Sequence, residues 1–174
     1  AAASRLLALR GQLDLNAGND RGRLYRVVPE GVTPRRRVDL SGADTAALAA
    51  LLDHPNGWHR DTAARLLHQR RDPAAPGRVA AVARSGTNPP GRLAALRLLG
   101  AWGQVPEDVL RRGLRDGDAR VRAAAVALVA AGHRGGPLPA GLAEEFAARA
   151  WDVPEVRLAL VQAQAAVKPP DRAT

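Results

Sequence analysis

The sequence contains no cysteine and no methionine, and aromatic residues make up only 3% of it. Without cysteine, this chain can form no disulfide, no thiolate metal site and no covalent attachment to haem. Because aromatic residues are so few, alanine and leucine must supply most of the core, which favours close-packed helices over a β-sheet. No apolar run approaches 18 residues, so the sequence predicts no membrane-spanning segment.

Lysine is also almost absent, since Lys168 is the only lysine beside 25 arginines. The net charge is +9, and this excess is spread along the chain without forming a stripe. A basic chain can bind nucleic acid, but dispersed arginines favour a solvated surface. The 174 residues suffice for one domain or a short run of repeats. Because residue 1 is alanine, we expect the chain to be a fragment or a processed piece of a longer protein.

An internal repeat is visible in the spacing of prolines and arginines. Pro73, Pro106 and Pro139 lie 33 residues apart, and each begins an apolar-periodic stretch, as expected for proline in a first helical turn. About midway between them, an Asn or Asp that suits a helix N-cap precedes an arginine by four residues, or by five in the last copy. These cap–arginine pairs are Asn56–Arg60, Asn88–Arg92, Asp118–Arg122 and Asp152–Arg157. Apolar residues three, six and seven positions after the first three arginines lie on one helical face.

This spacing predicts four antiparallel helical pairs, with Ser41 and Asp44 forming a capping-box-like start to the first helix. The predicted pairs are 41–53 with 57–70, 74–84 with 89–101, 106–115 with 119–131, and 139–150 with 154–167. The corresponding repeats are 41–72, 73–103, 104–136 and 137–168, and a tail follows at 169–174. The predicted fold class is all-α: a right-handed α-solenoid of about four helical hairpins, preceded by a short extended arm or strand.

Two stretches, Asp-Ala-Arg-Val-Arg-Ala-Ala-Ala at 118–125 and Asp152 through Arg157-Leu-Ala, resemble HEAT repeats. In that family the second helix of a repeat typically opens with Asp and then Val-Arg. The resemblance covers about residues 41–168. It implies that one arginine in each repeat helps to tie neighbouring repeats together, and the matching positions are Arg60, Arg92, Arg122 and Arg157.

Residues 1–40 lie outside the repeat. Alternation of polar and apolar residues over 23–28 predicts a strand, and turn-like residues flank it at 19–22 and 29–31. A lone strand needs partners, so the alternative is an irregular arm packed along the first helices.

Residues 20–27 (Asp-Arg-Gly-Arg-Leu-Tyr-Arg-Val) and the stretch from His54 to Leu67 resemble large multidomain proteins of planctomycete-type bacteria. These are called membrane-bound dehydrogenase or haem-binding-domain proteins, and they carry a sugar-dehydrogenase-like β-propeller, HEAT repeats and a c-type cytochrome segment. The resemblance implies that 1–40 holds the last propeller strand, and that a periplasmic or extracellular parent carries a quinone and c-type haem. This sequence lacks the propeller body and the Cys-x-x-Cys-His motif, so no catalytic residue carries over.

Side chains that could perform chemistry are few and poorly spaced. His54 and His59 are five residues apart, and His59 and His68 would lie about 13 Å apart along a helix, so neither pair predicts a metal site. We expect the acidic pairs 107–108 and 144–145 to lie in first helical turns, where they complement the helix dipole. Three tryptophans near turns are expected to serve packing; they are Trp58, Trp102 and Trp151.

We therefore expect no catalytic, cofactor-binding or metal-binding residue in this segment. Besides the four arginines, Trp58 and His59 are interaction candidates, because His59 takes the place where the third copy has apolar Val121. The first hypothesis is a non-catalytic scaffold that contacts a protein partner or neighbouring domains of a sugar-dehydrogenase-like parent. The alternatives are a DNA-glycosylase-like nucleic-acid module, which Trp58 and Asp61 would suit, and a peptide-binding solenoid. The residues for the latter are Arg65, Arg97 and Gln162.

Overall fold

The computed structural model describes residues 30–31, 38–134 and 136–164, and the chain divides into two units, 1–38 and 39–174. In the first unit, Glu30 and Gly31 lie in a turn, where Gly31 has a φ of 80°, as the sequence predicts. The predicted strand at 23–28 and the tail at 169–174 lie outside the described residues. In the second unit the described part of the chain is helical and holds no strand, which confirms the all-α class.

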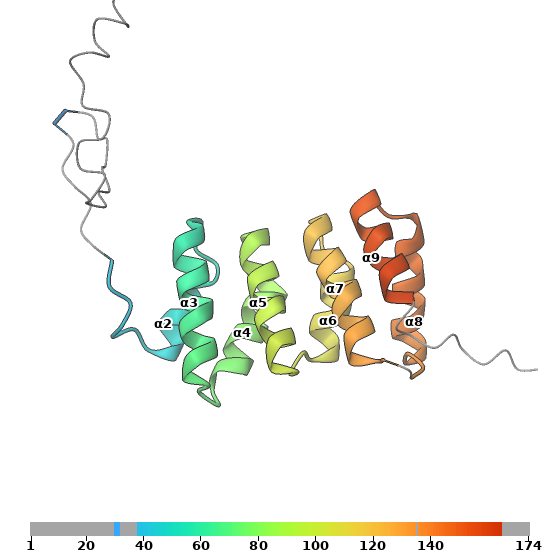
Figure 1. The fold of residues 1–174 in the computed structure, drawn as a ribbon, viewed down its shortest axis with the longest axis horizontal. Helices are drawn as coiled ribbons and strands as arrows, with labels where there is room; N and C mark the ends of the chain where they lie inside the picture. The colour runs from blue at the N-terminus through green and yellow to red at the C-terminus, as the bar shows by residue number, and fades with distance from the viewer. Residues whose placement is uncertain (1–29, 32–37, 135, 165–174) are drawn as a thin grey trace, which may run out of the picture. The chain divides into compact units, whose positions relative to one another are not determined.

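The helices of the second unit follow one another as four pairs (Figure 1). Their bounds are α2 Thr45–Leu51, α3 Gly57–Arg70, α4 Ala75–Ser85, α5 Pro89–Trp102, α6 Glu107–Leu114, α7 Ala119–Gly132, α8 Ala140–Ala147, the 3₁₀ helix η1 Ala148–Trp151, and α9 Pro154–Gln164. Within the first three pairs the two helices pack on each other, and η1 contacts both α8 and α9. The first helices of successive pairs also contact one another, as do the second helices, so the pairs form two layers.

The first helix begins later than predicted. It starts at Thr45, because Asp44 has an extended backbone and its side chain accepts a hydrogen bond from the Ala47 N–H at 2.7 Å. Ser41 lies in a preceding turn, where its N–H donates to the Asp39 carboxylate. Asp44 alone is therefore the N-cap, and the expected role of Ser41 as a cap is wrong.

The predicted caps of the second helices are confirmed for two of the first three pairs. The side chains of Asn56 and Asp118 accept hydrogen bonds from the backbone N–H groups of Trp58 and Arg120, each at 2.9 Å. Asn88 occupies the same position but makes no side-chain capping bond. The second residue of α5 is Pro90, which has no N–H to donate. The Asn88 amide instead donates to the His54 carbonyl at 3.2 Å.

The fourth pair departs from the predicted pattern at the end of its first helix. The α-helix stops at Ala147 and continues as one 3₁₀ turn to Trp151, a frequent way to tighten a helix end. The one extra residue between Asp152 and Arg157 lies after this turn, because α9 begins at Pro154, two residues beyond Asp152.

Alanine, leucine and valine supply the core, as the composition predicts. One cluster of buried residues spans α2 to α7, and a second spans α6 to α9. Phe146 is the only aromatic residue among the buried hydrophobic side chains of the described part. Because α6 and α7 contribute to both clusters, apolar packing is continuous from the first pair to the last.

Candidate functional site

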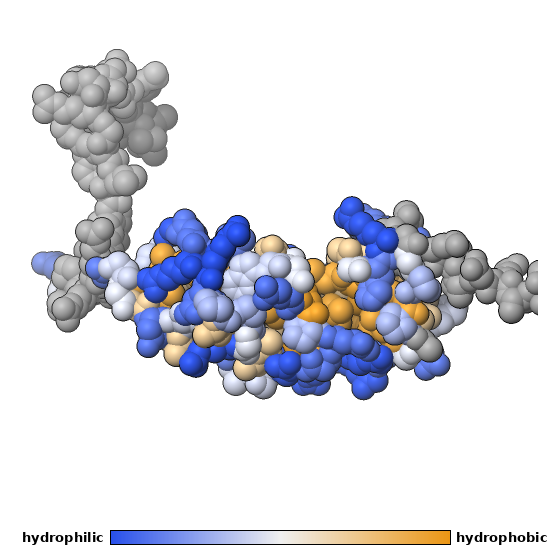
Figure 2. All heavy atoms as spheres, turned by 90° about the horizontal axis from the view of Figure 1, so that it is seen from below, coloured by the Kyte–Doolittle hydropathy of each residue, from blue (hydrophilic) through white to orange (hydrophobic). Residues whose placement is uncertain are grey.

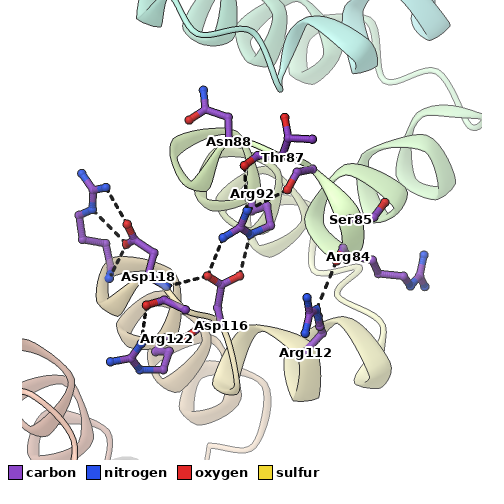
Figure 3. A network of polar contacts seen from close by, with 12 residues as sticks. Arg84, Ser85, Thr87, Asn88, Arg92, Arg112, Asp116, Asp118 and Arg122 are labelled. Atoms are coloured by element: carbon purple, nitrogen blue, oxygen red, sulfur yellow. Dashed lines mark hydrogen bonds and ion pairs between the residues drawn. The ribbon is translucent and has the colours of Figure 1, made fainter.

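The most regular feature of the described chain is a set of arginines that join consecutive helical pairs, which we call the arginine ladder (Arg92 with Asp116, and Arg122 with Asp152). Arg92 is on α5 and makes two hydrogen bonds to the Asp116 carboxylate, both 2.7 Å, across the gap to the next pair. Figure 3 shows this paired contact. Arg122 on α7 bonds Asp152 in the same way, at 2.8 and 2.6 Å.

Each of these arginines also holds the turn that precedes its own helix. One guanidinium nitrogen of Arg122 donates to the carbonyls of Asp116 and Gly117, the residues six and five positions earlier. Arg92 likewise donates to the carbonyls of Gly86 and Thr87, which are also six and five residues earlier in the chain. The guanidinium therefore fixes its own turn with one nitrogen and the next pair with the other two. This geometry suits the planar five-donor group of arginine and would not be reproduced by lysine.

The ladder is well shielded from solvent. The exposed side-chain fractions are 14% and 2% for Arg92 and Asp116, and 13% and 8% for Arg122 and Asp152. Burial opposes ionisation of Asp116, yet the Arg92 hydrogen bonds and the Asp118 N–H hold the pKa of this carboxyl below its ordinary value. Hydrogen bonds from Arg122 lower the pKa of Asp152. Both carboxylates are therefore ionised partners of arginine, and neither is set up as a general acid.

Arg60 repeats only half of this pattern. Its guanidinium donates to the carbonyls of His54 and Pro55 at 2.7 and 2.8 Å. The position that matches Asp116 in the following pair is Gly86, which offers no carboxylate. Asp53 replaces that tie, because it accepts hydrogen bonds from the backbone N–H groups of Thr87 and Asn88, both at 2.8 Å.

Arg157, the fourth predicted tie, lies exposed on α9. Its guanidinium makes no hydrogen bond or ion pair with any other residue that the structure describes. The four predicted arginines thus occupy equivalent positions, but only Arg92 and Arg122 link two pairs through a carboxylate.

The residues Trp58 and His59 lie in the first turn of α3. The ring centroids of His54 and His59 are 4.1 Å apart, and Trp58 meets His59 edge-on at 5.2 Å. Sequence spacing did not suggest the histidine contact, because His54 belongs to the turn before the helix. His54 Nδ1 accepts the Asn56 N–H at 3.0 Å, which leaves that nitrogen unavailable as a ligand. His59 is half-buried, and its Nδ1 has no partner among the described residues.

Two of the three tryptophans lie outside both core clusters, so the expected packing in the core is wrong for them. The side chains of Trp58 and Trp151 are exposed, because each lies at a helix end outside the apolar face. Trp102, at the end of α5, packs against the first core cluster and donates its indole N–H to His68 Nδ1 at 3.1 Å. This contact joins the ends of α3 and α5, and the separation of the two residues by about one repeat is the signal that could have predicted it.

A cavity of about 340 Å³ lies beside this contact. It is lined by His68, Arg71, Asp72, Pro73, Pro76, Ala101, Trp102 and Gln104. The Asp72 carboxylate is already held by the Thr45 hydroxyl and the Ala74 N–H. The cavity therefore has an aromatic wall and a cationic rim, but its one carboxylate is occupied by structural contacts.

One residue of each acidic pair, Asp108 in the first and Glu145 in the second, makes a contact between helices. Glu107 and Asp108 lie in the first turn of α6, as predicted, and they bind Arg111 and Arg84 respectively. The prediction for the second pair is wrong, because α8 begins at Ala140 and the two glutamates fall in its second turn. From there Glu145 reaches back to α6 and binds Arg111 at 3.0 Å and Arg115 at 2.6 Å.

Two shallow grooves lie between second helices, and they contain two of the residues predicted for peptide binding. The larger, of about 420 Å³, is lined by Arg97, Arg120, Ala123, Ala124, Ala127, Leu128 and Glu155. The smaller, of about 160 Å³, is lined by Ala127, Ala130, Ala131, Arg134, Ala159, Gln162 and Ala163. The structure thus places Arg97 and Gln162 at neighbouring grooves that share Ala127, whereas Arg65 lines neither of them.

The charge of the described residues is nearly balanced. Sixteen arginines stand against fourteen acidic residues there, a formal balance of +2, while the whole chain carries +9. Within residues 30–31, 38–134 and 136–164, no group of three or more His, Asp or Glu side chains is placed to hold a metal ion. No helix in the described segments combines the length and the apolar character that crossing a membrane requires.

Comparisons of the chain with protein-family models, with curated proteins and with solved structures find no match.

Proposed function

We propose that this chain is a non-catalytic scaffold and interaction segment, built as a HEAT-like right-handed α-solenoid of four helical pairs. The arginine ladder carries the proposal. The two best-shielded ion pairs between helices of the described part connect one helical pair to the next, as a rigid spacer requires. The ladder, the two-layer packing and the shared core clusters all support an arrangement in which each pair is stabilised by its neighbours.

The resemblance of residues 20–27 and 54–67 to multidomain dehydrogenases suggests where such a spacer acts. In a parent of that kind, the segment would hold a catalytic domain at a fixed separation from an electron acceptor or a partner protein. Quinone and haem would belong to other parts of that parent.

A test of rigidity is direct because the chain has no cysteine. Two exposed residues, Asp61 on α3 and Gln162 on α9, are replaced by cysteine and spin-labelled, and the distance between the labels is measured by pulsed electron paramagnetic resonance. A rigid scaffold gives one narrow distance distribution, and Asp116→Ala broadens it. A broad distribution in the otherwise unchanged chain would contradict the proposal.

A peptide-binding role is the second candidate, and the two alanine-lined grooves with Arg97 and Gln162 favour it. A library of extended peptides displayed on phage would identify ligands. Binding through these grooves should be lost in Ala127→Glu, because Ala127 lines both grooves and the larger side chain would occupy them. Binding should persist in the control variant Arg78→Ala on α4.

The nucleic-acid alternative makes a different prediction. Phosphate contacts give an affinity for duplex DNA that falls steeply with salt. The charge of the described residues is nearly balanced. We therefore expect the segment 38–164 to cause no salt-dependent shift in the electrophoretic mobility of duplex DNA at low ionic strength. A steep salt dependence in that segment would favour the nucleic-acid reading over the scaffold.

A further inference from the structure

The last helix, α9, has two apolar faces. Val156, Leu160 and Ala163 are buried in the second core cluster against the preceding pairs. On a different side of the helix, Leu158 and Val161 are 59% and 65% exposed. At the start of the same pair's connecting turn, the Trp151 side chain is also exposed. Figure 2 shows hydrophobic residues gathered over the part of the row that holds α7 to α9.

The positions of these exposed residues have counterparts in the preceding pairs. Val161 follows Arg157 by four residues, as Leu96 follows Arg92 and Val126 follows Arg122. Leu96 and Val126 are fully buried. Leu96 belongs to a core cluster with Val109 and Val121 of the next pair, and Val126 to one with Leu142 and Phe146 of the next pair. Val161 therefore occupies the helix position from which Leu96 and Val126 pack against the following helical pair.

The polar residues of this end follow the same rule. Arg157 is the counterpart of Arg92 and Arg122, each of which binds a carboxylate at the turn of the following pair. Trp151 precedes Asp152 as Arg115 precedes Asp116, and Arg115 also reaches the following pair, where it binds Glu145. Three side chains of the last pair thus stand where their counterparts make contacts to a neighbour.

From this register we propose that the α9 end, defined by Trp151, Arg157, Leu158 and Val161, is a docking surface for a helical hairpin of a partner protein. The hairpin presents an apolar helix face to Leu158 and Val161, and a carboxylate at its inter-helix turn to Arg157. The inference rests on the proposed scaffold function, and it gives that scaffold a specific partner surface.

A second copy of this chain does not fit the surface equally well. Its leading pair, α2 and α3, carries His54 at the turn position where Asp116 and Asp152 stand in later pairs. The neighbouring Asp53 already accepts the backbone N–H groups of Thr87 and Asn88. A second copy would therefore offer Arg157 an imidazole where the ladder uses a carboxylate.

The test uses the full chain and a probe of the proposed chemistry. The probe is a synthetic hairpin with the sequence of residues 137–164, cross-linked between its two helices, whose helicity is checked by circular dichroism. We expect calorimetric titration to show saturable binding that Arg157→Ala weakens by about tenfold or more, as for close charge pairs at interfaces. Val161→Glu should abolish binding because it buries an unpaired charge. Arg78→Ala, at an exposed position of α4, should leave binding unchanged.

A substitution in the probe gives an independent readout. Asp152→Asn in the synthetic hairpin leaves the full chain unchanged, and it should weaken binding as much as Arg157→Ala in the full chain does. Binding that survives Val161→Glu would place the hairpin elsewhere and overturn the proposal, as would an absence of binding by a helical probe. Self-association of the full chain that Val161→Glu removes, measured by sedimentation, would identify a second copy as the occupant and also overturn it. The spin-label distances are independent of these outcomes, so a failure here leaves the rigidity test standing.

Discussion

At the scale of single residues, the same Arg–Asp chemistry occurs in two environments. Arg92 and Asp116 are nearly buried, whereas the pair between Arg84 and Asp108 is exposed. Both pairs join consecutive helical pairs, so they differ mainly in solvation. Solvent and mobile ions weaken an exposed pair, while a shielded pair leaves a costly unpaired charge when one partner is removed.

We therefore expect Asp116→Ala to lower the free energy of unfolding by about 3 kcal/mol, because it leaves the shielded Arg92 guanidinium without its carboxylate. Urea denaturation followed by circular dichroism measures the loss. Asp108→Ala is the matched control, and its effect should be much smaller. Equal effects of the two substitutions would show that the arginine ladder contributes no more to stability than an exposed ion pair does.

A second residue-scale prediction concerns Arg71, which ends α3 in a left-handed conformation with a φ of 49°. The equivalent end of α5 has Gly103, with a φ of 66°. A side chain with a Cβ is strained there, so Arg71→Gly should stabilise the chain by about 0.5–1 kcal/mol. Arg71→Ala removes the charge but keeps the Cβ, and thermal unfolding should show little gain for it. A gain from both variants would point to charge instead of backbone strain.

At the scale of elements, helix packing depends on close approach at particular glycines. Gly91, in the first turn of α5, faces the end of α2. A Cβ at Gly91 would lie 2.6 Å from the Leu52 carbonyl oxygen and 2.9 Å from the Asp53 Cα, both of them backbone atoms. This approach brings Asp53 to the N–H groups of Thr87 and Asn88. Glycine at position 91 therefore allows Asp53 to connect the first helical pair to the second, although position 86 has no carboxylate for Arg60.

We expect Gly91→Ala to destabilise the chain by about 1–3 kcal/mol, since backbone atoms must move to admit the methyl group. Gly77 in the first turns of α4 is the control, because a Cβ there meets nothing within 4 Å. Gly77→Ala should stabilise by about 0.5–1 kcal/mol through helix propensity. Chemical denaturation of both variants measures the contrast, and a neutral Gly91→Ala would contradict the close approach of Leu52 and Asp53 to the first turn of α5.

At the scale of the whole molecule, stability should depend on acid pH through several carboxylates at once. Hydrogen bonds from Arg120 and the capping contacts lower the pKa of Asp118 from 3.8 to about 2. The pKa values of Asp53, Asp116 and Asp152 are also lowered. A carboxyl with a lowered pKa in the folded state stabilises the fold above its unfolded pKa, and this stabilisation is lost as pH falls towards the folded pKa.

The free energy of unfolding should therefore decrease as pH falls from about 3.8 towards 2, the interval set by Asp118. Urea denaturation at a series of pH values measures this slope. In Asp118→Asn the slope should be shallower, because asparagine still caps α7 but does not titrate. An unchanged slope in that variant would exclude Asp118 as a contributor.

The sequence by itself determined the order and approximate bounds of the helices. Prolines 33 residues apart and an Asn or Asp four residues before an arginine are local signals, and local backbone chemistry is enough to place Pro106, Asn56 and Asp118 at helix starts. The predicted capping bond of Asn88 does not form, because Pro90 lacks the N–H that would donate it. Asp44, and not Ser41, caps the first helix, because a capping bond depends on a backbone angle that residue type does not fix.

The partners of the arginines were decided only by the tertiary structure. Arg60, Arg92, Arg122 and Arg157 look alike in sequence, yet their contacts depend on what the next helical pair presents. That neighbour presents a glycine to Arg60 and an aspartate to Arg92 and Arg122. Such contacts join residues about 24 to 30 positions apart, where no local propensity acts. The sequence thus specifies helices through short-range hydrogen bonding, while packing between pairs specifies which charges are paired and which apolar side chains, such as Val161, stay exposed.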